Sequence, residues 1–322
     1  MGRLGLQRGP DSAFNEPFAY LLLQTMEQFA EYDPQFGWHD RLRAVLDTML
    51  AMRMGEPENL DRSTGLDVFS RMTQRTGDRR YLDFASRMIR QVLRTSPRIE
   101  GVPILQPGRD RVLWNECLAH LPPPCVAVAA LTGETDLVDL AIHTAHTLHR
   151  LNFDPGRNLW VHWGAPDRRG PAIWARGQGW ALVGLIGILR HLPDSHPERA
   201  SILRYVEEIL GGLIATQNAE GLWHNVMDDP RTRVCCRASA MFVYLLAEAR
   251  RKGWVKPERV DELLHRGWKG VRGRVWKDKL CCVCCGTGAG ATWQHYASRP
   301  MLFYGAPAAL RAGCSYTLAF GD

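Results

Sequence analysis

The chain has 322 residues, of which 45% are hydrophobic and 23% charged, and its formal net charge is +6. These values fit a globular protein with a substantial core. The longest apolar runs, such as 182–189, are too short to span a bilayer, and residues 1–12 do not resemble a secretory signal. Nine cysteines favour a reducing compartment, so we expect a cytoplasmic protein.

Apolar residues recur with a helical period along most of the chain, for example at Leu42, Val45, Leu46 and Met49. Few stretches alternate with period two, so we expect little sheet. In chain order, the expected helices cover 13–32, 37–53, 60–76, 80–96, 112–132, 135–152, 175–192, 198–217, 231–251 and 256–272, followed by one or two shorter helices within 287–313.

A turn pattern occurs twice, as Thr-Gly-Asp at 76–78 and as Thr-Gly-Glu at 132–134, each followed by similarly spaced apolar residues. The glycine suits the end of one helix and the acidic residue suits the start of the next. At this spacing the chain holds roughly six helical hairpins. Short turns alternate with the long loops 97–111, 153–174, 218–230 and 273–286, which a closed ring of hairpins would gather on one rim.

The segment WARGQGW at 174–180 enters an apolar helix and is the strongest local pattern. Arg176 offers a fork suited to a carboxylate, and Gln178 can bond a hydroxyl group. Trp174 and Trp180 flank them. A structural arginine is the alternative interpretation. Because the faces of sugar rings pack on aromatic rings, the aromatic residues of the loops suggest a sugar site. These residues are Trp160, Trp163, Trp174, Trp180, Trp223 and Trp293, with His162 and His224.

Two acidic residues stand at expected helix starts. Glu116 follows Trp114, and an apolar wall could raise the pKa of this carboxyl group, as a general acid requires. Asp61 follows Asn59 and Leu60 and could simply cap its own helix.

With these motifs, the chain resembles glycoside hydrolase family 105, the unsaturated rhamnogalacturonyl hydrolases, and more distantly the family 88 unsaturated glucuronyl hydrolases. The resemblance runs from about residue 13 to the C-terminus. It is carried by WARGQGW, by WNECLAH with Pro123, and by four further segments. These are GLWH at 221–224 with DDP at 228–230, ASAMF at 238–242, GTGAG at 286–290, and Arg299-Pro300.

The resemblance implies an all-α (α/α)6 barrel in one domain over 1–322, acting without metal or cofactor. One carboxyl group would protonate C4 of the C4=C5 double bond in a 4,5-unsaturated uronic acid at the non-reducing end of an oligosaccharide. Water would then add at C5, and the product would open and release the aglycone. Glu116 falls on the family's catalytic Asp, and Asp61 falls on its second, substrate-contacting Asp. The substrate-binding positions are expected to be Trp114, His162, Trp163, Trp174, Arg176, Gln178, Trp180 and His224.

The chain departs from the family pattern at several points. Glu116 is one methylene longer than the family's Asp, and the loop before Trp114 lacks the family's His, which Gln106 or Arg109 could replace. Asp110 is a rival acid. His120 stands at a usually apolar position, as a pocket histidine or a packing one. The outer helix before the first expected helix is missing, so residues 1–12 or a second subunit would cover the gap.

Other interpretations keep the barrel and change the chemistry. A glucuronidase-like enzyme would use Glu116 with Asp61 as a second acid, and a non-catalytic barrel would only bind carbohydrate. The basic stretch 250–279 is interrupted by acidic residues and is expected to be a solvated helix face, so we expect no nucleic-acid partner. Cys281, Cys282, Cys284 and Cys285 cluster without the paired spacing of a zinc ribbon, which favours buried thiols.

Overall fold

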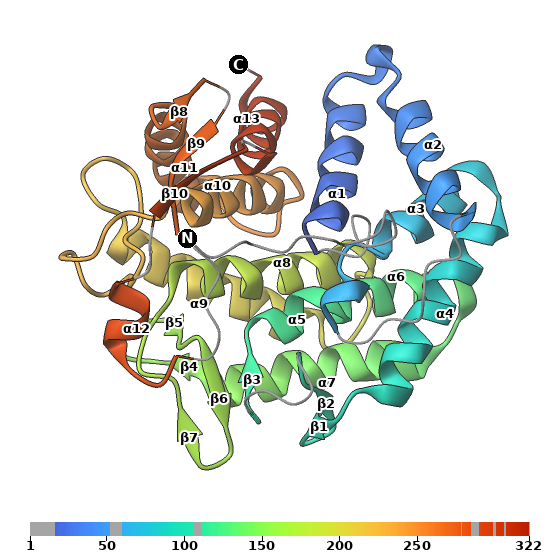
Figure 1. The fold of residues 1–322 in the computed structure, drawn as a ribbon, viewed down its shortest axis with the longest axis horizontal. Coiled ribbons are helices and arrows are strands. Elements are labelled where there is room, and N and C mark those ends of the chain that lie inside the picture. The colour runs from blue at the N-terminus through green and yellow to red at the C-terminus, as the bar shows by residue number, and fades with distance from the viewer. Residues whose placement is uncertain are drawn as a thin grey trace, which may run out of the picture.

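The computed structural model describes residues 17–51, 60–105, 111–277, 279–284, 290–298, 301–305 and 307–321. At 17–21, 61–62, 283–284 and 301–305 the description covers the backbone alone. Within these ranges the chain is mostly helical and forms the barrel of helical hairpins that the repeated turn predicted (Figure 1).

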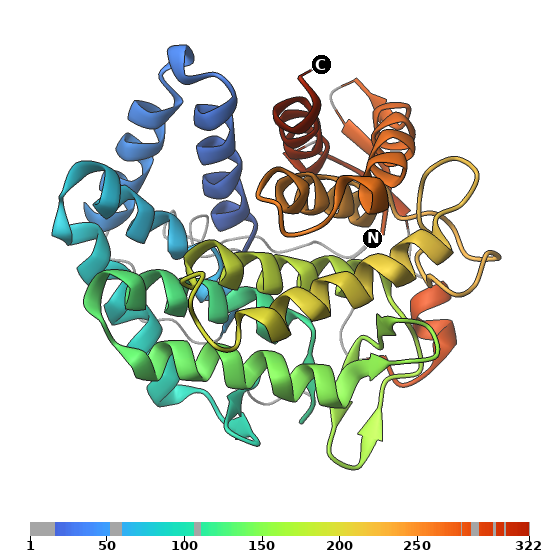
Figure 2. The same cartoon turned by 180° about the vertical axis from the view of Figure 1, so that it is seen from behind.

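Six helical segments form the inner ring, and each packs against the next until α13 meets α1. They are α1 (Pro17–Tyr32), α3 (Asp67–Thr76), α5 (Glu116–His120) continued by α6 (Pro122–Thr132), α8 (Ala175–His191), α10 (Cys236–Arg251) and α13 (Pro307–Phe320). Seen from behind, α7, α8 and α9 lie roughly parallel across the molecule (Figure 2).

The outer helices connect these inner segments. They are α2 (Trp38–Ala51), α4 (Arg79–Thr95), α7 (Thr135–Asn152), α9 (Arg199–Thr216) and α11 (Pro257–Arg272). An inner helix is buried on nearly all sides, as α8 is, whereas α4 buries one apolar face and exposes its arginines. The described residues contain no sixth outer helix, and the segment 1–12 that was expected to cover this gap lies outside them.

The turns between paired helices confirm the repeat. Gly77 and Gly133 both end a helix in the left-handed conformation, with φ of 74° and 79°, which costs little without a Cβ. Asp78 then caps α4 by accepting a hydrogen bond from the amide of Arg80.

Two expected helices are broken. The helix expected at 60–76 begins at Asp67, because a 3-10 turn, η3 (Leu60–Ser63), and Gly65 with φ of 74° precede it. The helix expected at 112–132 is split at Leu121, because prolines at 122–124 lack the amide hydrogen that a continuous helix needs. The helix expected at 231–251 begins at Cys236.

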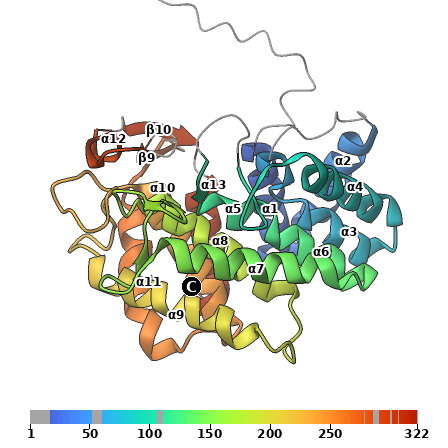
Figure 3. The same cartoon turned by 90° about the horizontal axis from the view of Figure 1, so that it is seen from below.

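The connections contain short strands, which the sequence had not revealed. They form small antiparallel sheets: β1 (Arg98–Ile99) with β2 (Val102–Pro103), β4 (Phe153–Asp154) with β5 (Leu159–Trp160), β3 (Leu113–Trp114) with β6 (Trp163–Ala165) and β7 (Arg168–Arg169), and β8 (Val275–Trp276) with β9 (Lys279–Cys284) and β10 (Met301–Gly305). Short helices η2 (Pro34–Phe36) and α12 (Trp293–Ala297) complete the elements. In Figure 3, α12, β9 and β10 lie on the same side of the molecule.

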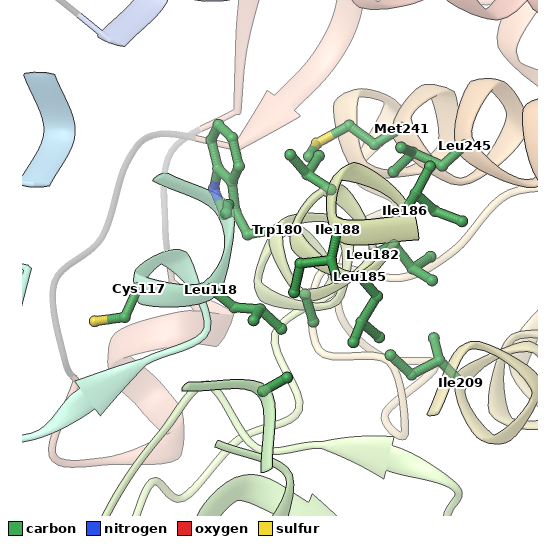
Figure 4. Close-up of a cluster of buried hydrophobic side chains, with 14 of the residues drawn as sticks. Cys117, Leu118, Trp180, Leu182, Leu185, Ile186, Ile188, Ile209, Met241 and Leu245 are labelled. Carbon is green, nitrogen blue, oxygen red and sulfur yellow. The ribbon is translucent and has the colours of Figure 1, made fainter. Parts of the chain in front are cut away.

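The core around α8 sets the position of the neighbouring inner helices. Side chains of α8 lie among Leu118 of α5, Ile209 of α9 and Met241 of α10 (Figure 4). A Cβ on Gly184 would come within 2.4 Å of Leu118 Cγ, so this glycine lets α5 approach α8 closely. The same Cβ would lie 2.5 Å from the carbonyl oxygen of Leu118, so the short helix α5 packs directly on the backbone of α8.

Candidate active site

A cross-strand pair places Glu116 beside His162. Strands β3 and β6 pair antiparallel with Trp114 opposite Trp163, and the amide of Asn115 donates to the carbonyl oxygen of His162 at 3.1 Å. Glu116 is the first residue of α5, directly after this pairing. The loop histidine and the acid at the helix start, which are 46 residues apart, thus meet at one point.

The carboxylate of Glu116 and the imidazole of His162 are in contact. His162 Nε2 lies 3.2 Å from Oε2 and 3.3 Å from Oε1 of Glu116, within hydrogen-bond distance of both carboxylate oxygens. Glu116 is 6% exposed and His162 is 0% exposed. The site therefore contains a buried acid–histidine pair with a small opening at the carboxyl group.

The prediction that the pKa of Glu116 is raised is wrong. Burial alone would raise this pKa, but the charge and the hydrogen bond of His162, with a smaller effect of His120, hold it below its ordinary value. Trp114 does form an apolar wall, since its ring lies 5.8 Å from that of His162. His162, together with the smaller effects around it, nevertheless lowers the pKa of Glu116 by more than burial raises it.

Arg176 lies in the first turn of α8 and is 8% exposed. Its guanidinium carbon lies 4.6 Å from the ring centroid of Trp174, a cation–π contact that orients it. Trp174 is fully buried and donates from Nε1 to Asn225 at 3.1 Å. Its fixed ring packs against both Arg176 and His162. A helix N-terminus and an arginine together favour an anion here.

Gln178 lies beneath the site rather than in it. Its side chain is 0% exposed, its Oε1 accepts from the amide of Trp160 at 3.0 Å, and its Nε2 donates to the carbonyl oxygen of the same residue. The prediction that Gln178 bonds a substrate hydroxyl is contradicted here, because both polar atoms of its side chain bond the backbone of Trp160 in strand β5. Gln178 acts as a clamp on the loop that carries His162.

A second histidine flanks Glu116. His120 is buried, its Nδ1 contacts Thr64 Oγ1, and its ring lies 5.3 Å from that of Trp180. His120 is therefore a buried residue, and not the partly exposed packing residue that was one of its two interpretations. Trp180 and Trp163 are 7% and 8% exposed, so both can present an edge to a bound molecule.

Asp61 lies in η3, which packs against α5, so its backbone is close to the helix that carries Glu116. Its side chain lies outside the described part, as do Gln106, Arg109 and Asp110. His224 is half-buried and donates from Nδ1 to the carbonyl oxygen of Thr232. Within the described ranges, no contact joins His224 to Glu116.

Three residues that shape the site were missed from the sequence. Tyr296 contacts His162 Nδ1 at 2.9 Å, Asn225 bonds Trp174 and the Tyr296 carbonyl oxygen, and Asn152 donates to Asn115 at 2.8 Å. Tyr296 stands between the GTGAG segment and Arg299-Pro300, so its position among matched motifs was the available signal.

In the ranges that the structure describes, no group of three His, Cys, Asp or Glu side chains could hold a metal ion. The cysteines at 235 and 236 are buried, and those at 281 and 282 are partly exposed. No helix among the described residues is long and apolar enough to cross a membrane.

Curated proteins share parts of this sequence. The unsaturated rhamnogalacturonyl hydrolase YesR of Bacillus subtilis is 27% identical over 175 residues, which cover 51% of each chain. An Agrobacterium fabrum protein, Atu3128, is 33% identical over 149 residues, which cover 42% of this chain and 63% of the relative. The matched part thus spans between half and two thirds of the length of these relatives.

Solved structures share the fold. A possible family 105 member from Klebsiella pneumoniae superposes with a TM-score of 0.84 at 20% identity, covering 95% of this chain and 82% of that one. A family 105 glycoside hydrolase from C. acetobutylicum gives a TM-score of 0.84 at 19% identity, covering 94% of both chains. The sequence pattern of glycosyl hydrolase family 88 matches residues 21–319, and the chain belongs to this family.

Proposed function

We propose that this protein removes a 4,5-unsaturated uronic acid from the non-reducing end of oligosaccharides that a polysaccharide lyase has produced. The observation that carries the proposal is the buried pair of Glu116 and His162 at the start of an inner helix, in a chain of family 88. The relative named unsaturated rhamnogalacturonyl hydrolase supports the substrate class.

The reaction begins with a proton on the pair. Because Glu116 has a lowered pKa, this group rests as a carboxylate and takes its catalytic proton from His162, whose Nε2 it faces. Transfer of this proton from Nε2 across the 3.2 Å contact makes Glu116 a carboxylic acid. The pair therefore supplies a general acid without requiring a raised pKa of Glu116.

Glu116 then protonates C4, and the electrons of the C4=C5 bond form the new C4–H bond. The positive charge at C5 is shared with the ring oxygen. Water adds to C5 and gives a proton to the carboxylate of Glu116, so that the acid is restored. The resulting hemiketal opens and releases the aglycone as an alcohol, with one water consumed in total. One carboxyl group thus performs both proton transfers.

Arg176 and Trp174 suit the substrate carboxylate. The uronic acid carries one negative charge, and the guanidinium at the first turn of α8 offers two parallel donors for it. Trp114, Trp163 and Trp180 are each at least 90% buried but retain an exposed edge, which suits packing against a sugar ring. Asp61 would take the second carboxylate position, as its place beside α5 allows.

The test uses unsaturated disaccharides from pectin, ulvan and glycosaminoglycan lyases, with the loss of the double bond's ultraviolet absorbance as the measurement. At least one substrate should lose its absorbance, and water labelled with oxygen-18 should enter at C5. A saturated glucuronide is the control. Cleavage of the saturated glucuronide, or loss of absorbance at an unchanged rate in Glu116→Gln, would contradict the proposal.

A further inference from the structure

Tyr296 lies behind His162, on the side away from Glu116. Its side chain is fully buried on α12, and its hydroxyl oxygen is 2.9 Å from His162 Nδ1. The two rings meet edge to face, at 87° with centroids 5.5 Å apart. Glu116 contacts the other ring nitrogen, so His162 is held between a carboxylate and a phenol.

Tyr296 is itself fixed from two directions. Its hydroxyl oxygen accepts a hydrogen bond from the amide of Gly290 at 3.0 Å, and its carbonyl oxygen accepts one from Asn225 Nδ2 at 2.8 Å. Asn225 also accepts from Trp174, whose ring packs on His162. The phenol is therefore held in place independently of its bond to the histidine.

A hydroxyl group can serve both states of the histidine. It accepts from Nδ1–H when the ring is an imidazolium, and it can donate to a bare Nδ1 when the ring is neutral with its proton on Nε2. A phenyl ring can do neither. Loss of the partner costs the charged ring more than the neutral ring, because hydrogen bonds to charged groups are about twice as strong.

We propose that Tyr296 is a positioning residue of the hydration reaction, whose hydroxyl aims Nε2 of His162 at Glu116 and favours the protonated ring. This inference rests on the proposed function. The proton passes from His162 Nε2 to Glu116 and then to C4 of the sugar, and the proton released by water returns along the same path. Tyr296 exchanges no proton with the substrate.

Other charged and titratable groups face the pair from neighbouring elements. His120 lies on α5 with Glu116 and lowers the pKa of its carboxyl group. Arg176 lies on α8 with its guanidinium over the ring of Trp174, which contacts His162. These groups remain unchanged when only the hydroxyl of Tyr296 is removed, so a Tyr296→Phe substitution isolates its effect.

The chain contains a matched control on its outer helices. Tyr205 on α9 contacts His146 Nδ1 at 2.8 Å with an 84° ring angle, and His146 Nε2 contacts Glu198 at 3.0 Å. This triad has the same three residue types in the same order as Tyr296, His162 and Glu116. Tyr205→Phe removes an equivalent hydroxyl contact, and the hydroxyl that is lost bonds His146 rather than a residue of the site.

The first experiment compares pH–rate profiles of the wild type, Tyr296→Phe and Tyr205→Phe on an unsaturated disaccharide. Activity needs the shared proton, so it falls as the pH rises through the titration of the pair. In Tyr296→Phe this fall should move to lower pH by about one unit, which gives a roughly tenfold lower rate above the midpoint. Tyr205→Phe should keep the wild-type profile. Equal profiles in all three proteins would overturn the proposal.

The second experiment needs no substrate, so it separates this proposal from the proposed function. Histidine labelled with nitrogen-15 reports by NMR which ring nitrogen carries the proton, and His162→Gln assigns the signal. The neutral His162 ring should carry its proton on Nε2, and Tyr296→Phe should shift its titration midpoint to lower pH. An unchanged midpoint, or a neutral wild-type ring with its proton on Nδ1, contradicts the proposal even if every disaccharide is cleaved.

Discussion

The two ends of helix α8 hold buried carboxylates beside different partners. At its N-terminal end, Glu116 faces the imidazole of His162. At its C-terminal end, about 24 Å away at 1.5 Å per residue, Arg71 bonds both Asp67 and Glu27. Both ends are lined by inner helices, and Glu116 and Asp67 are both buried. They differ in whether the partner can lose its charge.

A partly open cavity of about 950 Å³ also lies at the C-terminal end. Charged residues of five inner helices line it, among them Arg190 with its partner Glu248 at 2.5 Å. Burial would raise the pKa of Asp67, but Arg71 and its neighbours hold it well below its ordinary value. Arginine keeps its proton at all accessible pH values, so these carboxylates remain ionised and cannot serve as acids. Glu116 therefore differs from the carboxylates at the other end because its partner is a histidine, and not because of its burial or the size of a cavity.

The largest expected effect is the loss of activity in Glu116→Gln. The amide cannot accept the proton of His162 and pass it to C4, so the rate should fall by on the order of 100- to 10,000-fold. The measurement is the loss of absorbance of an unsaturated disaccharide. The same substitution at the other end, Glu248→Gln, should leave the rate per folded molecule within a few fold. Equal losses in both variants would show that the comparison between the two ends is wrong.

Arg71→Met should lower the stability of the protein and leave its activity intact, the opposite of what is expected for Glu116→Gln. It leaves Asp67 and Glu27 without the cation that both contact, so the free energy of unfolding should fall by about 3 kcal/mol, because unpaired buried charges are costly. Urea unfolding followed by circular dichroism measures this change. The activity of the folded fraction should persist.

Arg80→Met is the matched control for this loss, since Arg80 pairs with Asp78 in water-exposed surroundings. The exposed pair is screened by solvent, so its removal should change stability far less. A stability loss in Arg80→Met as large as in Arg71→Met would remove the distinction between the buried and exposed pairs.

A smaller loss of stability is expected for Gln178→Leu, at the N-terminal end of α8. The substitution leaves the amide and the carbonyl group of Trp160 without their partners, which should lower the free energy of unfolding by about 2 kcal/mol. If Gln178 instead contacted the sugar, KM would rise while stability stayed constant. Thermal unfolding and steady-state kinetics on the same protein preparation distinguish the two roles.

The sequence was sufficient for the fold because its signals are local. The helix-ending glycines Gly77 and Gly133 and the apolar stripes depend on neighbours within a few residues, and these predicted the ring of hairpins. Breaks at Gly65 and after Leu121 were missed, although the three prolines that follow Leu121 are a visible signal. The apolar residues keep their helical period on both sides of these prolines, so the period alone does not reveal the break.

The site was only partly predictable because its chemistry depends on contacts between distant segments. Glu116, Trp114 and His162 were named, but the contact between Glu116 and His162 arises from the pairing of β3 with β6. That pairing also reverses the expected direction of the pKa shift. Tyr296 reaches the site from 134 residues away, and no spacing rule connects it to His162.

The smallest effect concerns the pH dependence of stability at the cavity end. Burial and the charges of Arg71 and Arg190 lower the pKa of His191 to about 3, and Nη1 of Arg71 donates to His191 Nε2 at 3.2 Å, which requires a neutral ring. Between about pH 6.5 and pH 3, the unfolded chain therefore binds a proton that the folded chain excludes. The free energy of unfolding should fall by about 1 kcal/mol for each pH unit below 6.5 on account of this residue.

His191→Asn keeps an acceptor for Arg71 and removes the titration, so its stability should decline less between pH 7 and pH 5 than that of the wild type. His143→Asn, on the exposed face of α7, should decline as the wild type does. Urea unfolding at the two pH values measures the difference. If His191→Asn and the wild type lose stability in parallel, the histidine is protonated in the folded protein. The cavity end would then contain a titratable partner like that of Glu116, and the contrast between the two ends of α8 would rest on Arg71 and Arg190 alone.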